Sequence, residues 1–205
     1  VDQLVSEIDR VARQTNFNGT ALLDGSFSGQ LMQIGADAGQ TIGINTIINA
    51  NTTKLGSANY AATTKATTAA SGTATAVGSV AASTINGVVT DKVDIAIGDT
   101  GLDVTKKVAA SINDKMDQTG VYAEVGATGV VNLTAIKPSE TDAGVFKAIT
   151  AAGTGVGAFT PTAATAAPAK TYVSGLDIST VVGSQQAMSI ADKALSAVNS
   201  ARADM

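Results

Sequence analysis

Cysteine and histidine are both absent from the 205 residues, and their absence excludes several chemistries. Without a thiol or an imidazole there is no disulfide, no cysteine nucleophile, no histidine base and no ordinary zinc site. Serine and lysine remain, but neither G-x-S-x-G nor S-x-x-K occurs in a convincing context. We therefore expect no enzyme, no catalytic residue and no cofactor.

Charged and aromatic side chains are also scarce, at 15% and 3% of the chain. The net charge of -4 leaves no basic footprint for nucleic acid or for anionic lipid. Uninterrupted apolar runs fall well short of the roughly 18 residues that a membrane helix needs. We expect neither nucleic acid nor a membrane as a partner. The apolar fraction is 44%, and much of it is alanine.

Both ends of the chain have helical periodicity. In the first segment the apolar residues recur at steps of three and four, which places them along one side of a helix: Val1, Leu4, Val5, Ile8, Val11 and Ala12. Glu7 with Arg10, and Asp9 with Arg13, have the spacing of ion pairs on its solvated face. The last segment has a heptad seam: Ala187, Ala191, Ala194, Val198, Ala201 and Met205.

Alanine on this seam buries too little surface to hold a helix alone, so each end needs a partner. The simplest partner is the other end, which predicts one helical unit built from residues far apart in sequence. Ser184 is placed to cap the second helix. The residues predicted to pack in this helical unit are Leu4, Ile8, Val11, Ala191, Leu195 and Val198.

A corner follows the first helix, where "QTNFNG" at 14–19 brings turn chemistry directly after the helical pattern. Its predicted residues are Gln14, Phe17, Asn18 and Gly19. Beyond it, "QLMQIGADAGQTIGIN" has Met32 and Ile34 on one face, a connection rich in glycine, and Ile42 and Ile44 on one face again. This pattern predicts a β-hairpin.

The middle of the chain lies between two tracts rich in alanine, threonine and glycine, at 60–76 and 148–170. Between them "TINGVVT" and "KVDIAIG" predict strands, and a second hairpin is predicted in "VYAEVGATGVVNLTAI". A helix is expected between these pairs, with Asp103 as N-cap and Gly120 as its stop. Its predicted buried stripe is Val104, Val108, Ile112 and Met116.

The predicted fold class is therefore α+β. A discontinuous helical rod domain with a β-hairpin is built from both chain ends, 1–56 and 172–205, and a small ββαββ domain is inserted at 57–171.

Two motifs in the middle resemble ligand sites. Asp91, Asp94, Asp99 and Asp103 could suggest calcium, but their spacing fits no EF-hand loop, and strand-end or cap roles explain them. "GTGVGA" at 153–158 lacks the flanking strand and helix of a phosphate loop. We expect no metal site.

Three stretches carry a family resemblance. "LVSEIDRVARQTNFNGTALLDGS" with "QIGADAGQTIGIN" resembles the second half of the N-terminal region of bacterial flagellin, and "AMSIADKALSAVNSARADM" resembles the start of its C-terminal helix. Together they cover 55 of the 205 residues, in the family's order. The segment from "TINGVVT" to "VVNLTA" is similar to an insertion module of flagellins and hook proteins.

The resemblance implies a structural subunit of the bacterial flagellar filament, which self-assembles in the full-length protein and serves swimming motility. The terminal regions would form the rod, and the middle would face outward as a surface-exposed, antigenic domain. A cysteine-free chain suits type III export in an unfolded state, so the implied location is extracellular. The implied partners are other flagellin subunits, an export chaperone, the filament cap, a host innate immune receptor and antibodies.

The chain begins and ends inside helical patterns and lacks the family's outermost helices, so we expect a segment of a longer protein. Taken alone it should be monomeric, and its activation of the immune receptor should be weak or absent. A different class of function stays open, because a ββαββ insertion could instead serve as a surface adhesive or ligand-binding module.

Overall fold

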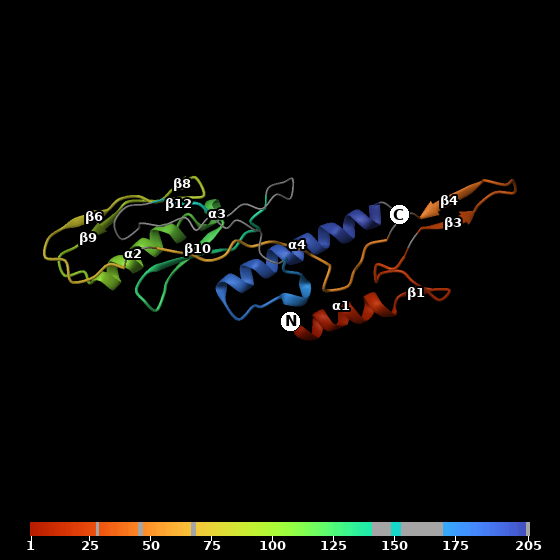
Figure 1. The fold of residues 1–205 in the computed structure, drawn as a ribbon, viewed down its shortest axis with the longest axis horizontal. Coiled ribbons are helices and arrows are strands. Elements are labelled where there is room, and N and C mark those ends of the chain that lie inside the picture. Colours follow the sequence, from red (N-terminus) through yellow and green to blue (C-terminus); the bar gives the residue numbers. More distant parts are fainter. Residues whose placement is uncertain (28, 45–46, 67–68, 141–148, 153–169, 204–205) are drawn as a thin grey trace. The chain divides into compact units, whose positions relative to one another are not determined.

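The computed structural model describes residues 1–27, 29–44, 47–66, 69–140, 149–152 and 170–203. The Gly-rich segment 153–158, most of the 148–170 tract and Met205 lie outside these residues. The chain is a mixture of helix and sheet, as expected for its class, and divides into two compact units (Figure 1). Unit 1 comprises Val1–Ala58 and Lys170–Met205, and unit 2 comprises Asn59–Ala169.

The two long helices of unit 1 are α1, Asp2–Gln14, and α4, Val181–Ala203, so both predicted helices are confirmed. Thr180 caps α4, because its Oγ1 accepts a hydrogen bond of 2.9 Å from the Gly183 backbone N–H. The prediction of Ser184 as the cap is wrong. Ser184 already lies within the first turn, and its hydroxyl donates back to the Ile178 carbonyl at 3.3 Å.

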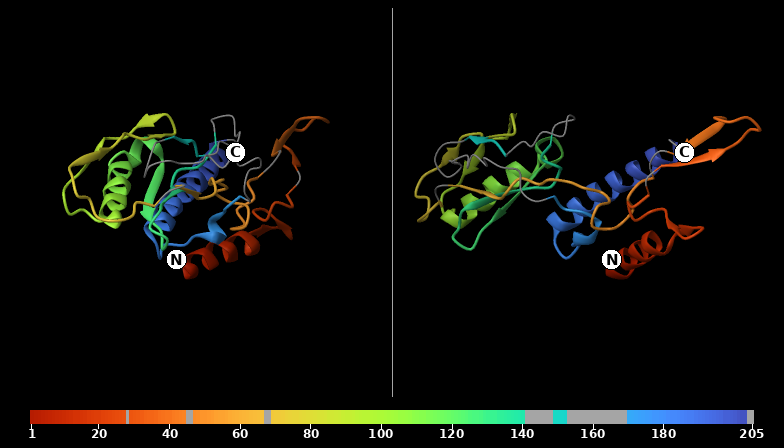
Figure 2. Two further views of the ribbon diagram at one scale, coloured as in Figure 1. Left: turned by 60° about the vertical axis from the view of Figure 1, so that its left-hand side comes forward. Right: turned by 45° about the vertical axis from the view of Figure 1, so that its right-hand side comes forward.

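Two antiparallel hairpins follow α1. The first joins β1, Asn16–Phe17, to β2, Thr20–Ala21, through the Asn18-Gly19 turn. The second joins β3, Gln30–Gln33, to β4, Thr41–Ile44, with Met32 opposite Ile42, so the predicted hairpin is confirmed. Figures 1 and 2 show the β3–β4 hairpin extending away from the rest of unit 1.

Unit 2 packs a helix against a sheet. Helix α2, Gly101–Asn113, lies along β10, Val121–Val125, whose hairpin partner is β11, Val131–Ala135. The predicted stripe of Val104, Val108 and Ile112 is buried, and the predicted second hairpin is confirmed. The other fully buried side chains of this core include Val121, Val131 and Leu133.

The ends of the helical segment differ from the prediction. Thr100 is the N-cap, and Asp103 occupies the third helical position, where its carboxylate accepts from Thr100 in a capping box. Helix α2 stops at Asn113, so the half-buried Met116 begins a separate short helix, α3, Met116–Thr119, rather than extending the stripe. Gly120 ends α3 with φ 67°, as a left-handed C-cap.

The strands of unit 2 do not form one sheet. β7, Thr84–Ile85, pairs with β8, Val88–Val89, and with β12, Ala151–Ala152. β9, Val93–Ile95, pairs instead with β6, Gly78–Val80, and β5, Thr64–Lys65, joins β11. The predicted strand segments on both sides of α2 are present, but the ββαββ order is wrong, because "TINGVVT" forms two strands, β7 and β8, and β5, β6 and β12 were not predicted. Strand pairing uses the backbone N–H and C=O groups, which every residue except proline carries. Segments rich in small residues can therefore pair, as β5 and β6 do.

Candidate assembly surface

Helices α1 and α4 line a single apolar groove in unit 1. It has a volume of about 1090 Å³, and the loop before Ala58 and the residues after Thr171 complete its walls. All six side chains predicted to pack in the helical unit line this groove: Leu4, Ile8, Val11, Ala191, Leu195 and Val198. The other apolar residues around it include Val1, Val5, Leu23, Ile178 and Met188.

The two end helices do not close this groove by packing on each other. Leu4 is 72% exposed and Leu195 is 61% exposed, and both Ile8 and Val11 are also exposed. The expectation that the end helices bury one another is therefore wrong for this chain. The side chains that are buried on these helices are mostly small ones, Ala12, Ala187 and Ala194, together with Ile190. Because the buried side chains are small, they leave open space between the two helices. The larger apolar side chains line this space and remain exposed.

The floor of the groove is a segment that the sequence analysis did not single out. Leu55 and Val173 line the groove there and are buried, and Val173 lies with Ile190 of α4 beside Gly56 of the same segment. Ala58 and Thr171 exchange backbone hydrogen bonds of 2.9 and 2.8 Å, and the Val173 N–H donates to the Leu55 carbonyl at 3.1 Å. The segment has no helical or strand periodicity, so only its Lys54-Leu55-Gly56 turn chemistry could have indicated it.

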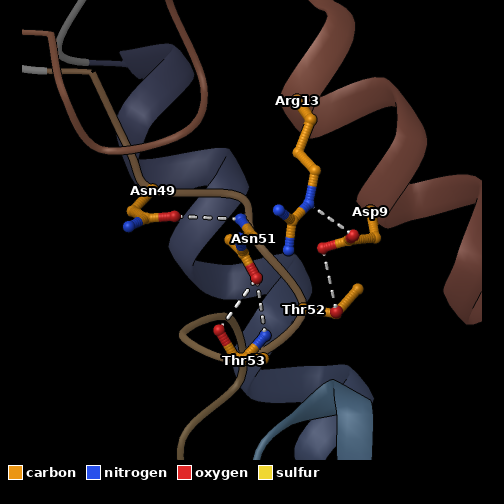
Figure 3. Close-up of polar contacts among 6 residues, drawn as sticks. All are labelled: Asp9, Arg13, Asn49, Asn51, Thr52 and Thr53. Atoms are coloured by element: carbon orange, nitrogen blue, oxygen red, sulfur yellow. Dashed lines mark hydrogen bonds and ion pairs between the residues drawn. The ribbon is translucent and has the colours of Figure 1, made fainter.

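A polar tie connects α1 to this floor (Figure 3). The carboxylate of Asp9 accepts from the Arg13 Nε at 2.6 Å and from the hydroxyl of the buried Thr52 at 3.3 Å. The hydrogen bond from Arg13 is the main cause that holds the pKa of Asp9 below its usual value. Asn51 shapes the same turn, because its side-chain oxygen accepts from the N–H and the hydroxyl of Thr53. The hydrogen bond between Thr52 and Asp9 therefore links α1 to the segment that contains Asn51 and Thr53.

The predicted corner residues lie at the end of α1. The side-chain oxygen of Gln14 accepts from Arg10 at 2.8 Å, and its carbonyl accepts from the Asn16 amide at 3.0 Å. Asn18 and Gly19 form the turn with φ 49° and 80°. Phe17 is 71% exposed, so it is not a core residue of this unit.

The aspartates of unit 2 have structural partners. Asp99 pairs with Lys107 at 2.6 Å, and Asp103 contributes to the capping box from the third helical position of α2, not as the predicted N-cap. Within the described ranges no group of three or more histidine, cysteine, aspartate or glutamate residues is placed to hold a metal ion. In the same part of the chain, no helix combines the length and the apolar character needed to cross a membrane.

Comparison with known proteins gives relatives over the whole chain. It is 30% identical over 209 residues to polar flagellin C of Vibrio parahaemolyticus, across 98% of this chain and 51% of that protein. It is 31% identical over 206 residues to flagellin B of Vibrio cholerae, across 100% of this chain and 51% of that protein. The chain is of the flagellin type. Because flagellins are structural filament proteins, this relationship confirms that the chain is not an enzyme.

The flagellin-type chain spans about half the length of the curated relatives it matches, 51% in each of these alignments. No family model matches it. Among solved structures, FliC from Burkholderia pseudomallei is similar with a TM-score of 0.47 and 22% sequence identity, over 98% of this chain and 78% of that chain.

Proposed function

We propose that this chain is part of a structural subunit of the bacterial flagellar filament. In the full-length protein it assembles with other flagellin subunits outside the cell and serves swimming motility. Two observations support the proposal: flagellin relatives match the whole chain, and unit 1 holds an apolar groove that its own residues leave open.

The groove is the observation that carries the proposal. Leu4 of α1 and Leu195 of α4 both line the groove, and most of each side chain is exposed to solvent. Burying apolar surface is favourable by about 25 cal/mol for each Å² removed from water. Contiguous exposed apolar surface of this kind marks an interaction site. Alanines 187, 191 and 194 let another helix approach α4 closely. The occupant that suits the family is an apolar helix supplied by flagellin segments outside this chain.

We assign the two units different roles within the filament. Unit 1 contributes to the helical rod, and its boundaries lie close to the predicted 1–56 and 172–205. Unit 2 corresponds to the predicted outer variable domain, 57–171, which would face outward and carry antibody epitopes. An export chaperone, the filament cap and a host immune receptor remain proposed partners of the full-length protein, and receptor recognition would use unit 1.

Charged substitutions in the groove test this function. Leu4→Asp or Leu195→Asp in the full-length protein should abolish filaments in electron micrographs, because either change places a charge inside the proposed helix interface. Both side chains are exposed in this chain, so its own fold should survive, as circular dichroism would show. Leu102→Asp, an exposed position in unit 2, is the matched control and should leave filaments intact. Normal filaments from Leu195→Asp would contradict the proposal.

A surface adhesive or ligand-binding module is the second candidate. It is favoured by a cleft of about 230 Å³ in unit 2, whose lining includes Lys137, Glu140 and Gln118. Deletion of the gene separates the two functions. Loss of swimming with adhesion intact in the deletion strain would remove the adhesive candidate, whereas swimming cells that no longer adhere would favour it.

A further inference from the structure

The structure contains two Asn-Gly turns with nearly the same backbone. Asn18-Gly19 closes the β1–β2 hairpin with φ 49° and 80°, and Asn86-Gly87 closes the β7–β8 hairpin with φ 50° and 84°. Both are two-residue turns, between Phe17 and Thr20 in the first and between Ile85 and Val88 in the second. They therefore form a matched pair, in which the same dipeptide has the same local conformation in two surroundings.

The side-chain amide of Asn86 is held in place. Its Nδ2 donates to the Thr119 carbonyl at 2.8 Å, and its Oδ1 accepts from the Thr150 N–H at 2.9 Å. Its own backbone N–H also donates to the Thr150 carbonyl at 2.8 Å. The residue is half-buried. If this amide moved toward the backbone of Gly87, its hydrogen bonds to Thr119 and Thr150 would both break at a half-buried position.

The side-chain amide of Asn18 has no such restraint. Asn18 and Gly19 are both exposed, and no hydrogen bond to the Asn18 side chain is formed within the described ranges. Around Gly19, the space that a Cβ would occupy has no other atom within 4 Å. Gly87 has the same open space, so the two turns differ in the hydrogen bonds and burial of the asparagine and not in the glycine.

We propose that Asn18 is a site of spontaneous deamidation. The backbone nitrogen of Gly19 attacks Cγ of Asn18, the new N–Cγ bond closes a five-membered succinimide, and the Cγ–Nδ2 bond breaks. The amide leaves as ammonia and carries away the proton of the Gly19 N–H. Water then opens the ring at either carbonyl and leaves aspartate or isoaspartate, with no oxidation or reduction. Solvent water is the only co-reactant.

The products would change the corner after α1. Either one introduces a carboxylate at an uncharged turn. Isoaspartate also routes the main chain through the side-chain methylene, and the longer backbone cannot keep the two-residue turn that sets Phe17 opposite Thr20. Unmodified and modified chains would therefore differ in the β1–β2 hairpin, while the β7–β8 hairpin stays intact.

Peptide mapping of the intact, folded chain tests the proposal. After incubation in mildly alkaline buffer, trypsin releases residues 14–54, which contain Asn18, and residues 66–92, in which Asn86 is the sole asparagine. Tandem mass spectrometry then measures the conversion of each asparagine to aspartate and isoaspartate. Asn16, which precedes Phe17 in the same peptide, is an internal control for a bulky neighbour.

In the folded chain Asn18 should convert at least about tenfold faster than Asn86, the factor expected when two ordinary hydrogen bonds must first be lost. In denaturant the two rates should become similar, because only the fold distinguishes the two dipeptides. Asn18→Gln cannot close the same ring and should remove the product at that position without changing Asn86. Equal rates in the folded chain, a rate difference that persists in denaturant, or an Asn18 rate no higher than that of Asn16 would each overturn the proposal.

Discussion

At the residue scale, Gly56 shows how one small residue sets the floor of the groove. Its backbone φ of +70° is a value that residues with a side chain rarely adopt. A Cβ placed there would lie 2.6 Å from the Ile190 carbonyl oxygen and 3.1 Å from a methyl group of Val173. The missing side chain therefore lets the loop approach α4 closely enough to bury Leu55 and Ala58 beside it.

Gly56→Ala should therefore destabilise unit 1. The left-handed backbone alone costs a residue with a Cβ roughly 1–2 kcal/mol, and the clash with α4 adds to it. Gly39→Ala is the control, because Gly39 also has positive φ but open space around its Cβ position. Urea unfolding should show the larger loss for Gly56→Ala. Equal losses would mean that the close approach to α4 contributes nothing.

Two large apolar residues of α4, Ile190 and Leu195, should respond differently to truncation. Ile190 is 1% exposed, so Ile190→Ala should lower the free energy of unfolding by about 2–5 kcal/mol, the usual range for a core isoleucine. Leu195 stands at the groove rim, and Leu195→Ala should change it by less than about 0.5 kcal/mol. Chemical denaturation of both variants checks the contrast. A core-sized loss for Leu195→Ala would show that the groove is closed in solution.

At the scale of elements, α1 buries little of its surface against the rest of unit 1. Its most buried side chain is Ala12, and its large apolar residues line the open groove. The Asp9 carboxylate, held by Arg13 and bonded to Thr52, supplies a specific link to the 51–55 turn. The orientation of this helix therefore depends on a polar contact as well as on burial.

This link should weaken in acid. The folded pKa of Asp9 lies below its usual value, so its contribution to stability is present above the unfolded pKa of about 3.9 and is lost as the pH falls through the folded pKa. Since Arg13 is the larger cause, Arg13→Gln should raise the pKa of Asp9 more than Thr52→Val does, as an NMR titration of the carboxyl would show. Thr53→Val, which leaves Asp9 untouched, is the control. The reverse order for Arg13 and Thr52 would contradict this account.

At the scale of the whole molecule, each unit has a core of its own. Unit 1 buries Ile190 with Val173 and Leu55, and unit 2 buries Leu133 with Ile112 and Val121. Separate cores of this kind define separate folding units. The chain should therefore lose its structure in two steps rather than one.

Leu133→Ala tests this division. The side chain is fully buried, so its truncation should destabilise unit 2 by about 2–5 kcal/mol. Hydrogen exchange followed by mass spectrometry should show faster exchange in peptides of 59–140, with those of α4 unchanged. Ile190→Ala is the reciprocal variant and should affect unit 1 alone. Faster exchange throughout the chain in either variant would mean that the two units unfold as one.

The sequence by itself determined the kinds of elements and most of their positions. Helical spacing in 1–14, turn chemistry at Asn18-Gly19 and alternation around Ile42 are local signals, because each depends on the conformation of a few neighbouring residues. The flagellin resemblance came from the same stretches, and the whole-chain relatives confirm it. The six residues predicted to pack between the end helices all line the groove, since one apolar side of each helix carries them.

Only the tertiary structure decided which neighbours those residues have. Thr100 and Thr180, rather than Asp103 and Ser184, act as caps because the cap is set by where the backbone leaves the helical conformation, and several polar residues lie within one turn of that point. Strand partners such as β5 for β11 depend on long-range pairing, and small alanine and threonine side chains give it no pattern in the sequence. Leu4 and Leu195 were expected to be buried, but they are exposed, because burial needs an opposing surface and periodicity shows only which side a residue faces.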